Sequence, residues 1–486
     1  MPRSKGVFLG FAALLAGALS VFALSGVLAA PRAAFLHIAT NLSSRSARYS
    51  YYADIAASPD GERVAVVWSE AYTDFGGAAK GSVYLRWASE STGSGWSAPV
   101  TVHAGDKNEC ARWAAVAVTG TNPYTAVVAY ITQSPCDAPN FQAIRYRFCT
   151  LGGSCGSVQT AVSVNPQPND VGYGSVDIVL DSGGQPHFVY AYYRRDASLG
   201  KDVGTVYYVS SGTTNPEQVS QNEHDARTPA IAWSGGVVHV VWATEPAGTN
   251  YDYFVFYRRR TGSGWIAQQG LIRQSLGYAP HNPSIGVSGN MVLVAWDMNN
   301  AEGDQDCGNN QAACEKYTLA YIRSTDNGES WPLDSGVPLW YELGGGAFGT
   351  GRPYTSTGAV REYIRFLRPS VGFRANGKPV MVWHVNDGTT EKPDYNLYYT
   401  EALTVPENAA DPIEWAQIRR FGQNLPLHSA SPVVAPFLAR DTLHVVYLQS
   451  VQDSSGSVVD WETYYDGNEY DRYSHVYLPI VMRNVR

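Results

Sequence analysis

The chain has 486 residues, enough for two or three average domains or for one large β-rich unit. Charged residues make up only 16% of the sequence and the net charge is −8, which excludes proteins that hold nucleic acid through a basic surface. Glycine (47), tyrosine (32) and tryptophan (13) are abundant, and this favours a turn-rich β protein.

Residues 1–30 have the pattern of a signal peptide. Arg3 and Lys5 precede an uncharged apolar run, and Val27 and Ala29 fall at the −3 and −1 positions of a cleavage site. An uncleaved membrane anchor is the alternative, because about 25 apolar residues can span a bilayer. Both interpretations place the remaining chain outside the cytoplasm, secreted or at the cell surface.

Six cysteines fall into three pairs that are close in sequence. An even number of cysteines in an exported chain predicts disulfides rather than metal ligands, and no CxxC or histidine-rich spacing accompanies them. The predicted bridges are Cys110–Cys136, Cys149–Cys155 and Cys307–Cys314.

A two-strand unit recurs seven times along the chain. Each unit has a polar or proline-led start, an alternating strand, a glycine turn and a second strand that ends in an aromatic residue; residues 228–242 show this best. The first strands are predicted to begin near Tyr52, Trp113, Ser175, Thr228, Asn282, Arg368 and Ser431. The aromatic residues that end the second strands are Trp68, Tyr130, Tyr190, Trp242, Trp296, Trp383 and Tyr447.

A motif of the form S-x-D-x-G-x-x-W lies between the third and fourth predicted strands of the fifth unit. Its residues are Ser324, Asp326, Gly328 and Trp331. The short acid can accept bonds from nearby backbone N–H groups, glycine can adopt a positive φ, and tryptophan can fix the turn against its sheet. Residues 89–96 and 258–265 retain parts of the pattern.

This motif resembles the Asp-box, also called the bacterial neuraminidase repeat, of sialidase-like β-propellers. Together with the repeats, the resemblance implies an all-β fold: a seven-bladed β-propeller of four-stranded antiparallel blades. The predicted organisation is a signal peptide (1–30), an N-terminal segment (31–48), the propeller (49–470) and a C-terminal tail (471–486).

Two segments compete to provide the strand that closes the ring. The run 35–38 is one candidate, as N-terminal strands often close such rings, and the tail segment 475–482 is the other. The tail also resembles a short terminal segment of exported bacterial proteins, so a sorting or anchoring signal remains an alternative for it.

Strand direction divides the predicted loops between two faces. One face, named here the mouth face, carries the starts of the first strands, the links between blades and the loops that join second to third strands. The opposite face, the turn face, carries the turns between third and fourth strands, including Asp326. Cys110 and Cys136 both fall on the mouth face, so they are placed to bond. In the family that the motif resembles, the boxes also lie away from the active site, so Asp326 is predicted to be structural.

Residues at the starts of the first strands should surround the opening of a central channel. Arginine binds carboxylates through bidentate hydrogen bonds, and aromatic rings can stack on the faces of sugars. The candidate ligand-binding residues are Tyr51, Tyr52, Glu70, Arg112, Trp113, Tyr173, Arg227, Glu245, His281 and Arg368. The alternative is structural: the arginines pair with acids of neighbouring blades and the tyrosines pack in the core.

The loop 297–315 is acidic. Asp304 and Asp306 are spaced somewhat like calcium ligands, but the glutamate that completes an EF-hand loop is absent, so a solvated loop is the preferred reading. No other cofactor is expected.

Three functions are compatible with this pattern. The first is a non-catalytic propeller that binds a glycan or a cell-surface protein through the mouth face. The second is an exo-sialidase-like hydrolase, whose family uses three arginines on the substrate carboxylate, a tyrosine nucleophile assisted by a glutamate, and an aspartate acid/base. Arg112, Arg227 and Arg368 would supply the arginines, but the family's early Arg-Ile-Pro motif is absent and its members have six blades.

The third function is a polysaccharide lyase acting on uronate polymers. Arg227 with His281, or Arg112 with Tyr173, would neutralise the carboxylate and remove a proton. This reading rests on fold-level analogy. Binding is the preferred interpretation. A membrane contact is expected only through an uncleaved signal or the C-terminal tail.

Overall fold

The chain divides into two units, Met1–Ile38 and Ala39–Arg486, and all described residues belong to the second. The computed structural model describes residues 40–43, 49–73, 79–88, 95–106, 108–120, 122–136, 141–165, 170–213, 215–221, 225–245, 254–272, 278–300, 316–334, 336–343, 365–386, 395–421, 429–434, 442–452 and 458–469. Within these ranges the regular structure consists of β-strands, and no helix there is long and apolar enough to cross a membrane.

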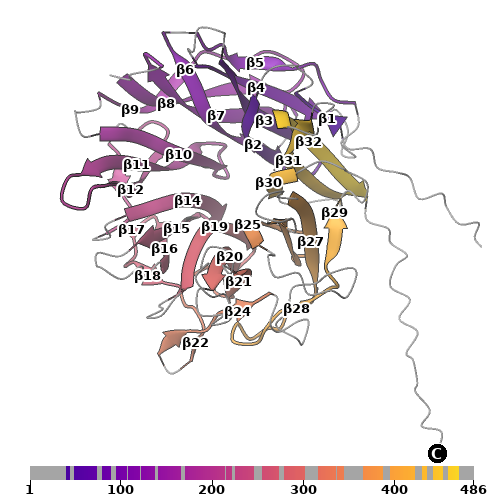
Figure 1. The fold of residues 1–486 in the computed structure, drawn as a ribbon. Helices are drawn as coiled ribbons and strands as arrows, with labels where there is room; N and C mark the ends of the chain where they lie inside the picture. The colour runs from indigo at the N-terminus through magenta and orange to yellow at the C-terminus, as the bar shows by residue number, and fades with distance from the viewer. Residues whose placement is uncertain are drawn as a thin grey trace, which may run out of the picture. The chain divides into compact units, whose positions relative to one another are not determined.

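Three antiparallel sheets of four consecutive strands come first (Figure 1). The first contains β2 (Tyr49–Ala57), β3 (Val64–Thr73), β4 (Ala79–Ala88) and β5 (Val100–His103). The second contains β6 (Cys110–Val118), β7 (Thr125–Ser134), β8 (Phe141–Thr150) and β9 (Gln159–Val164). The third contains β10 (Asp170–Leu180), β11 (Pro186–Asp196), β12 (Lys201–Ser210) and β13 (Glu217–Gln218).

The middle of the chain forms larger sheets. One contains β14 (Asp225–Ser234), β15 (Val237–Glu245), β16 (Phe254–Thr261), β17 (Gly264–Trp265) and β18 (Gln269–Gly270). The next has nine strands: β19 (Tyr278–Ser288), β20 (Met291–Asn300), β21 (Lys316–Ser324), β24 (Tyr341–Glu342), β25 (Arg365–Phe373), β26 (Pro379–Asn386), β27 (Tyr395–Thr404), β28 (Glu414–Trp415) and β29 (Arg419–Phe421). A single parallel pair, Tyr317 with Arg365, joins its two halves. The strands β22 (Leu333–Asp334) and β23 (Val337–Pro338) form a separate hairpin.

The last sheet joins distant parts of the sequence. It contains β30 (Ser429–Val434), β31 (Thr442–Gln452), β32 (Val458–Glu469) and, as its outermost strand, β1 (Thr40–Asn41). Thr40 pairs with Tyr465 and Asn41 with Tyr464. The segments 35–38 and 475–482 lie outside the described residues, so the pairing of β1 is the observed link between the chain's early and late segments.

The first strands of successive sheets lie side by side. These strands, named here the inner strands, are β2, β6, β10, β14, β19, β25 and β30; each contacts the next, and β30 contacts β2 (Figure 1). The all-β class and the antiparallel, propeller-like arrangement are therefore confirmed. Each inner strand begins two to five residues before its predicted start, because pairing with the second strand continues past a bulge.

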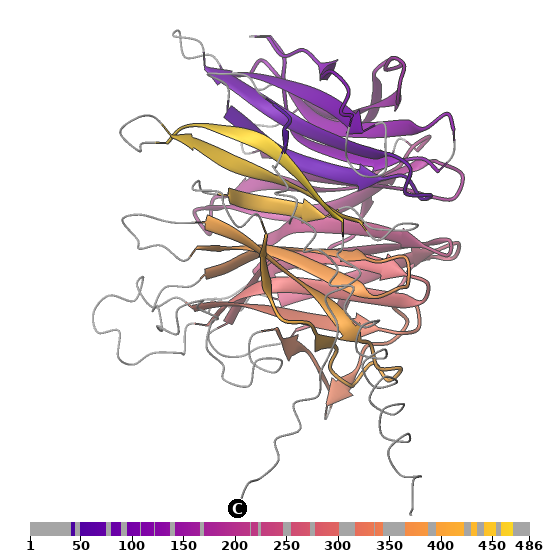
Figure 2. The same ribbon diagram turned by 90° about the vertical axis from the view of Figure 1, so that its right-hand side faces the viewer.

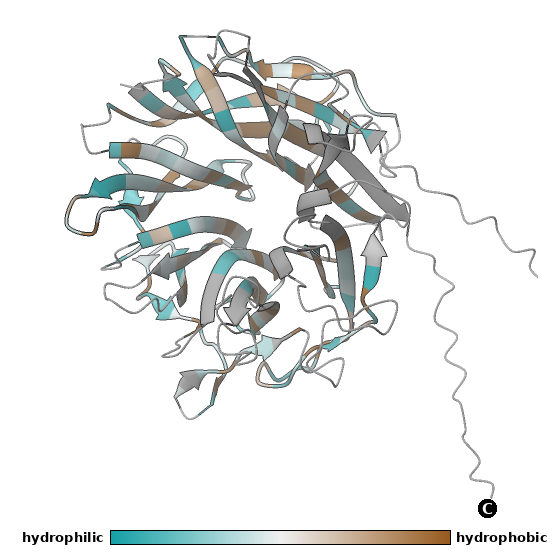
Figure 3. Ribbon diagram, in the orientation of Figure 1, coloured by the Kyte–Doolittle hydropathy of each residue, from teal (hydrophilic) through white to brown (hydrophobic). Residues whose placement is uncertain are grey.

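The seven aromatic residues predicted to end the second strands are buried, but they lie near the middle of these strands. Each strand continues for three to six residues past its aromatic residue, because pairing with the inner strand extends beyond the bulge. Trp68, Tyr130, Tyr190, Trp242, Trp296, Trp383 and Tyr447 are each 2% exposed or less. All except Tyr190 lie opposite the extra residue of a bulge in the inner strand, where the wider gap accepts a large ring. Figure 3 shows hydrophobic colour along strands such as β7, and hydrophilic colour at the ends of β10 and β11.

Arginines of the third strands tie neighbouring sheets together. Arg258 donates from Nε to the carbonyl of Ile266 in its own sheet (2.8 Å), and from Nη1 to Val219, which follows the last strand of the preceding sheet (2.9 Å). Arg86 and Arg147 make the same pair of bonds, to Ser97 and Leu42 and to Gly156 and Val102 respectively. The repeat analysis did not single out these arginines.

Two of the predicted disulfides are confirmed. Cys110 bonds Cys136 and Cys149 bonds Cys155. The first bridge joins the start of β6 to the loop after β7, which places both ends on the mouth face. Cys307 and Cys314 lie outside the described residues. The two bridges indicate an extracellular protein.

Candidate functional site at the mouth face

Every inner strand has a β-bulge close to its start. In β2 the register shifts between Tyr51 and Asp54. The other bulges fall between Arg112 and Ala115, Tyr173 and Ser175, Arg227 and Ala230, His281 and Ser284, Leu367 and Ser370, and Ala430 and Val433. The antiparallel register places these bulges opposite the middle of the second strands. Figure 2 shows that the strands run between two opposite faces.

Four of these bulges hold a non-glycine residue in the left-handed region. The φ angles are 51° at Tyr52, 55° at Trp113, 45° at Thr228 and 45° at Asn282. Side chains with a Cβ rarely adopt this conformation, and for β-branched Thr228 it is a clear outlier. The same strained geometry in four sheets means that the surrounding structure imposes it, and it turns these side chains away from the regular strand direction.

Tyr52 and Trp113 stack on each other across the boundary between the first two sheets. Their ring centroids are 3.5 Å apart and the ring planes differ by 27°. Both residues are half-buried, and Trp113 packs against the core cluster that contains Tyr173. The pair forms a partly exposed aromatic surface of the kind that suits one face of a sugar ring.

Arg112 lies beside this stack and has no partner among the described residues. Its guanidinium makes no hydrogen bond or ion pair there, and the residue is exposed. Desolvation by the surrounding protein lowers the pKa of Arg112, and the nearby Tyr52 phenol opposes this effect. A guanidinium of this kind can hold a carboxylate through two parallel hydrogen bonds.

Arg227, in contrast, is engaged by an acid of its own strand. Its Nε donates to Asp225 Oδ1 (2.8 Å) and its Nη2 lies 2.7 Å from Oδ2. Asp225 is fully buried and also accepts from the backbone N–H of Gly204 (3.0 Å), while the Arg227 side chain is 49% exposed. The side chain of Arg368 lies outside the described part. The structure therefore describes one unpaired and one paired arginine of the three.

The third sheet adds a cluster that the sequence did not reveal. Asp170 accepts from the Tyr192 hydroxyl (2.8 Å), and Arg194 Nε lies 3.2 Å from its other oxygen. The Arg194 side chain is 69% exposed. Tyr192 and Arg194 follow the buried Tyr190 at alternate positions of the same strand, and this period-2 signal could have identified them. Tyr192 meets Tyr173 edge to face.

The other candidate ligand-binding residues whose side chains are described are buried or half-buried. Tyr173 is 3% exposed, and burial raises its pKa above the usual range. Glu70 is 2% exposed and accepts from the Trp68 indole N–H (2.9 Å). His281 is half-buried and pairs in register with Asp297. The side chains of Tyr51 and Glu245 lie outside the described part.

The Ser324–Trp331 turn follows the C-terminal end of β21, on the turn face. Asp326 accepts from the Ser324 hydroxyl (2.6 Å) and from the Ser330 backbone N–H (3.0 Å). Gly328 has a φ of 74°, and a Cβ there would lie 1.8 Å from the Tyr257 hydroxyl oxygen of the preceding sheet. The turn is therefore a contact between sheets, away from the mouth face.

No metal centre is found in the part of the chain that the structure describes, where no three His, Cys, Asp or Glu side chains gather. Asp304 and Asp306 lie outside that part, so the calcium alternative stays a prediction.

No protein-family model matches this chain, and no curated protein matches it. Solved structures with a similar β architecture include the NanB sialidase of Streptococcus pneumoniae, with 12% identity and a TM-score of 0.44 over 89% of this chain and 70% of that one. A GH93 α-L-arabinofuranosidase of Fusarium graminearum has 9% identity and a TM-score of 0.43, covering 89% of this chain and 98% of that one. A sialidase of Trypanosoma rangeli has 11% identity and a TM-score of 0.40, covering 86% and 54%.

Proposed function

We propose that this chain is an exported, seven-bladed β-propeller that binds a carboxylate-bearing sugar at its mouth face. The blade count follows if the nine-stranded sheet is two blades joined by the single Tyr317–Arg365 pair, since its halves have separate inner strands, β19 and β25. Export is supported by the disulfides and by the signal-like residues 1–30.

One observation carries the binding proposal: the unpaired, exposed Arg112 adjoins the stacked rings of Tyr52 and Trp113. The aromatic surface would contact the apolar face of a sugar, and the guanidinium would hold its carboxylate through two charge-assisted hydrogen bonds. Because Asp225 already neutralises Arg227, that arginine adds less to the attraction for an anion.

Binding is favoured over catalysis by the environment of the candidate bases. A general base works best when its pKa lies near the working pH, whereas burial raises the pKa of Tyr173 and keeps its hydroxyl protonated. Glu70 is buried and already accepts the Trp68 N–H. The sialidase and lyase functions remain the alternatives that the test must address.

Calorimetric titration with acidic and neutral oligosaccharides tests the proposal. Sialyllactose and trigalacturonate are the acidic probes, and lactose is the neutral one. Arg112→Ala should weaken binding of an acidic probe about tenfold or more, since each charge-assisted bond contributes roughly 1.5–3 kcal/mol. Arg112→Lys should bind with intermediate affinity, because the ammonium keeps the charge and loses the fork.

Equal binding of acidic and neutral probes, or unchanged binding by Arg112→Ala, would contradict the proposal. Release of free sialic acid from sialyllactose, or new ultraviolet absorbance from an unsaturated uronate product, would favour the hydrolase or the lyase instead.

A further inference from the structure

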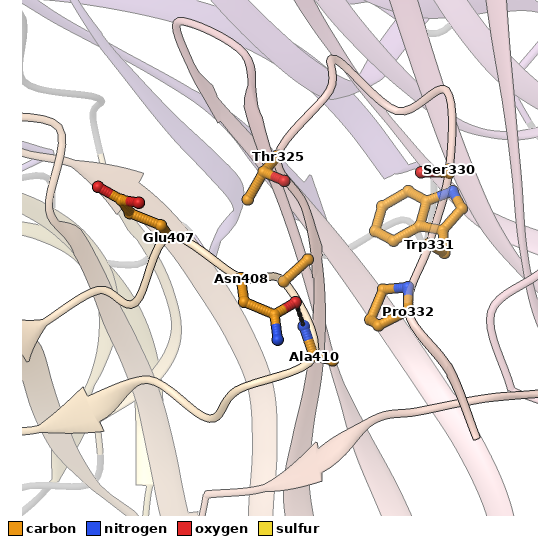
Figure 4. A pocket seen from close by; sticks show the side chains of 8 residues that line it. Thr325, Ser330, Trp331, Pro332, Glu407, Asn408 and Ala410 are labelled. Carbon is orange, nitrogen blue, oxygen red and sulfur yellow. Dashed lines mark hydrogen bonds between the residues drawn. The ribbon is translucent and has the colours of Figure 1, made fainter.

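A pocket of about 270 Å³ lies on the turn face, far along the strands from the mouth face (Figure 4). The Ser324–Trp331 turn and the adjoining Pro332 form one wall, and residues 407–410, in the loop between β27 and β28, form the other. Its size is just below the range of roughly 300–1,000 Å³ for pockets that hold drug-sized ligands, which suits a ligand of one ring.

The wall that contains Trp331 is held in place by the preceding sheet. The indole N–H donates to Gln269 Oε1 (3.0 Å), and the ring meets Tyr257 edge to face with 4.9 Å between centroids. Because these contacts fix one edge of the indole, a ligand would find the ring already oriented, and binding would cost little side-chain entropy.

The opposite wall is held by a buried arginine. Arg323, 2% exposed, donates to the carbonyls of Pro406 (2.7 Å), Asn408 and Asp411 (3.2 Å). The Tyr341 hydroxyl donates to the carbonyl of Ala410. Both walls are therefore fixed by contacts outside the pocket.

Three polar groups of the pocket have no partner among the described residues. They are the Thr325 hydroxyl, the Glu407 carboxylate and the Asn408 amide nitrogen; the Asn408 oxygen accepts from the Ala410 N–H (3.1 Å). Figure 4 shows Thr325 and Asn408 across from the Trp331 ring and Pro332, with Glu407 at the edge of the pocket. The pocket thus combines an apolar surface with free acceptors and a free donor.

This combination favours a neutral sugar over charged ligands. An anion would meet the Glu407 carboxylate on a chain of net charge −8, with no cationic side chain lining the pocket. A lysine or arginine side chain offers donors only and would leave the Asn408 amide N–H unmatched. Sugar hydroxyls both donate and accept, and a pyranose has an apolar face for the indole.

We propose that this pocket binds one ring of a neutral hexose, separately from the site at the mouth face. Trp331 and Pro332 contact the apolar face of the ring, Glu407 accepts from its hydroxyls, and Asn408 and Thr325 bond the remaining oxygens. The chain would then contact carbohydrate on two opposite faces.

Saturation-transfer NMR on the full chain with the methyl glycosides of glucose, galactose and mannose tests this site. At least one glycoside should bind, and Thr325→Val and Glu407→Gln should each weaken that binding by about fivefold or more. The first change removes a hydrogen bond, and the second replaces a charged acceptor with a weaker neutral one. Both side chains are exposed and make no hydrogen bond or ion pair with the residues that the structure describes, so the melting temperatures of the variants should equal that of the original chain.

The matched control is Glu414→Gln, an exposed glutamate of β28 outside the pocket, which should bind as the original chain does. Arg112→Ala should also retain hexose binding, so failure of the mouth-face proposal would leave this result intact. Absence of transfer from all three glycosides, or equal binding by the pocket variants, would overturn the inference. Binding of Nα-acetyl-lysine amide in place of the glycosides would also overturn it and would identify a pocket for cationic side chains.

Discussion

The Asp54 carboxylate of β2 accepts a hydrogen bond from the backbone N–H of Val116 in β6, with 2.7 Å between Oδ2 and the nitrogen. The same link recurs at two further boundaries between sheets. Asp177 accepts from Ile231 (3.0 Å), and Ser284 accepts from Val371 (3.1 Å). A side chain shortly after the bulge therefore binds the next inner strand at three boundaries. The charge of Asp177 also acts on Asp54.

This arrangement predicts that stability falls as pH rises through the acidic range. Burial, followed by the charge of Asp177, raises the pKa of Asp54 from 3.8 to about 7, and burial raises that of Asp177 to about 6. Because the folded pKa values exceed those of the unfolded chain, the folded state holds extra protons between pH 4 and 7. The contribution of these groups is complete below pH 4 and is lost as pH rises to about 7.

Thermal melts at constant ionic strength across this range measure the effect. Asp54→Asn keeps an oxygen for the Val116 N–H and removes the titration, so its stability should depend less on pH. A slope between pH 4 and 7 that is equal in both proteins would contradict the assignment to Asp54.

The arginines at the mouth face should differ in their effect on stability. Arg227→Ala leaves the buried Asp225 with the Gly204 N–H as its remaining described partner, and should cost about 1–3 kcal/mol. A larger loss is not expected, because Arg227 is half-exposed. Arg112→Ala removes no contact within the described structure and should leave the free energy of unfolding almost unchanged. Urea denaturation of both variants gives the comparison, and equal losses would refute it.

Asp326 should affect stability and not binding at the mouth face. Asp326→Ala removes the acceptor for Ser324 and Ser330, and should cost about 1–2 kcal/mol, as for the loss of a helix-capping acceptor. Calorimetry at ambient temperature should find binding at the mouth face unchanged. Loss of that binding in a variant that melts normally would show that the two faces are coupled.

Arg258, which is 5% exposed, should stabilise the boundary between two sheets. Lysine has one ammonium and cannot reach the Ile266 and Val219 carbonyls with the same planar geometry, so Arg258→Lys should cost about 1.5–3 kcal/mol. Guanidinium chloride denaturation measures this loss. Arg195→Lys is the control, because the Arg195 side chain is 51% exposed and pairs only with the exposed Asp202, and it should cost little.

The positions and types of the strands followed from local sequence. Alternating apolar residues, glycine turns and a buried aromatic such as Trp242 indicate a half-buried hairpin, whose geometry depends on residues that are near in sequence. The ends of the strands were less accurate, since the second strand continues past Trp242 to Glu245. The Cys110–Cys136 and Cys149–Cys155 bridges were predictable for a related reason: short spacing and strand direction place each pair at one end of a sheet.

Tertiary structure decided which polar and aromatic side chains meet across sheets. Arg112 and Arg227 occupy equivalent positions at the starts of inner strands, and the repeat pattern did not separate them, although a local difference in sequence does. Arg227 has an aspartate two residues earlier on the same side of its strand, whereas the residue in that place before Arg112 is Cys110, which bonds Cys136. The stacking of Tyr52 on Trp113 likewise requires two bulges in neighbouring sheets to present their rings to each other. The periodicity of the sequence determines which side chains of a strand are buried. The contacts of the side chains at the exposed end of a strand depend on the neighbouring sheet.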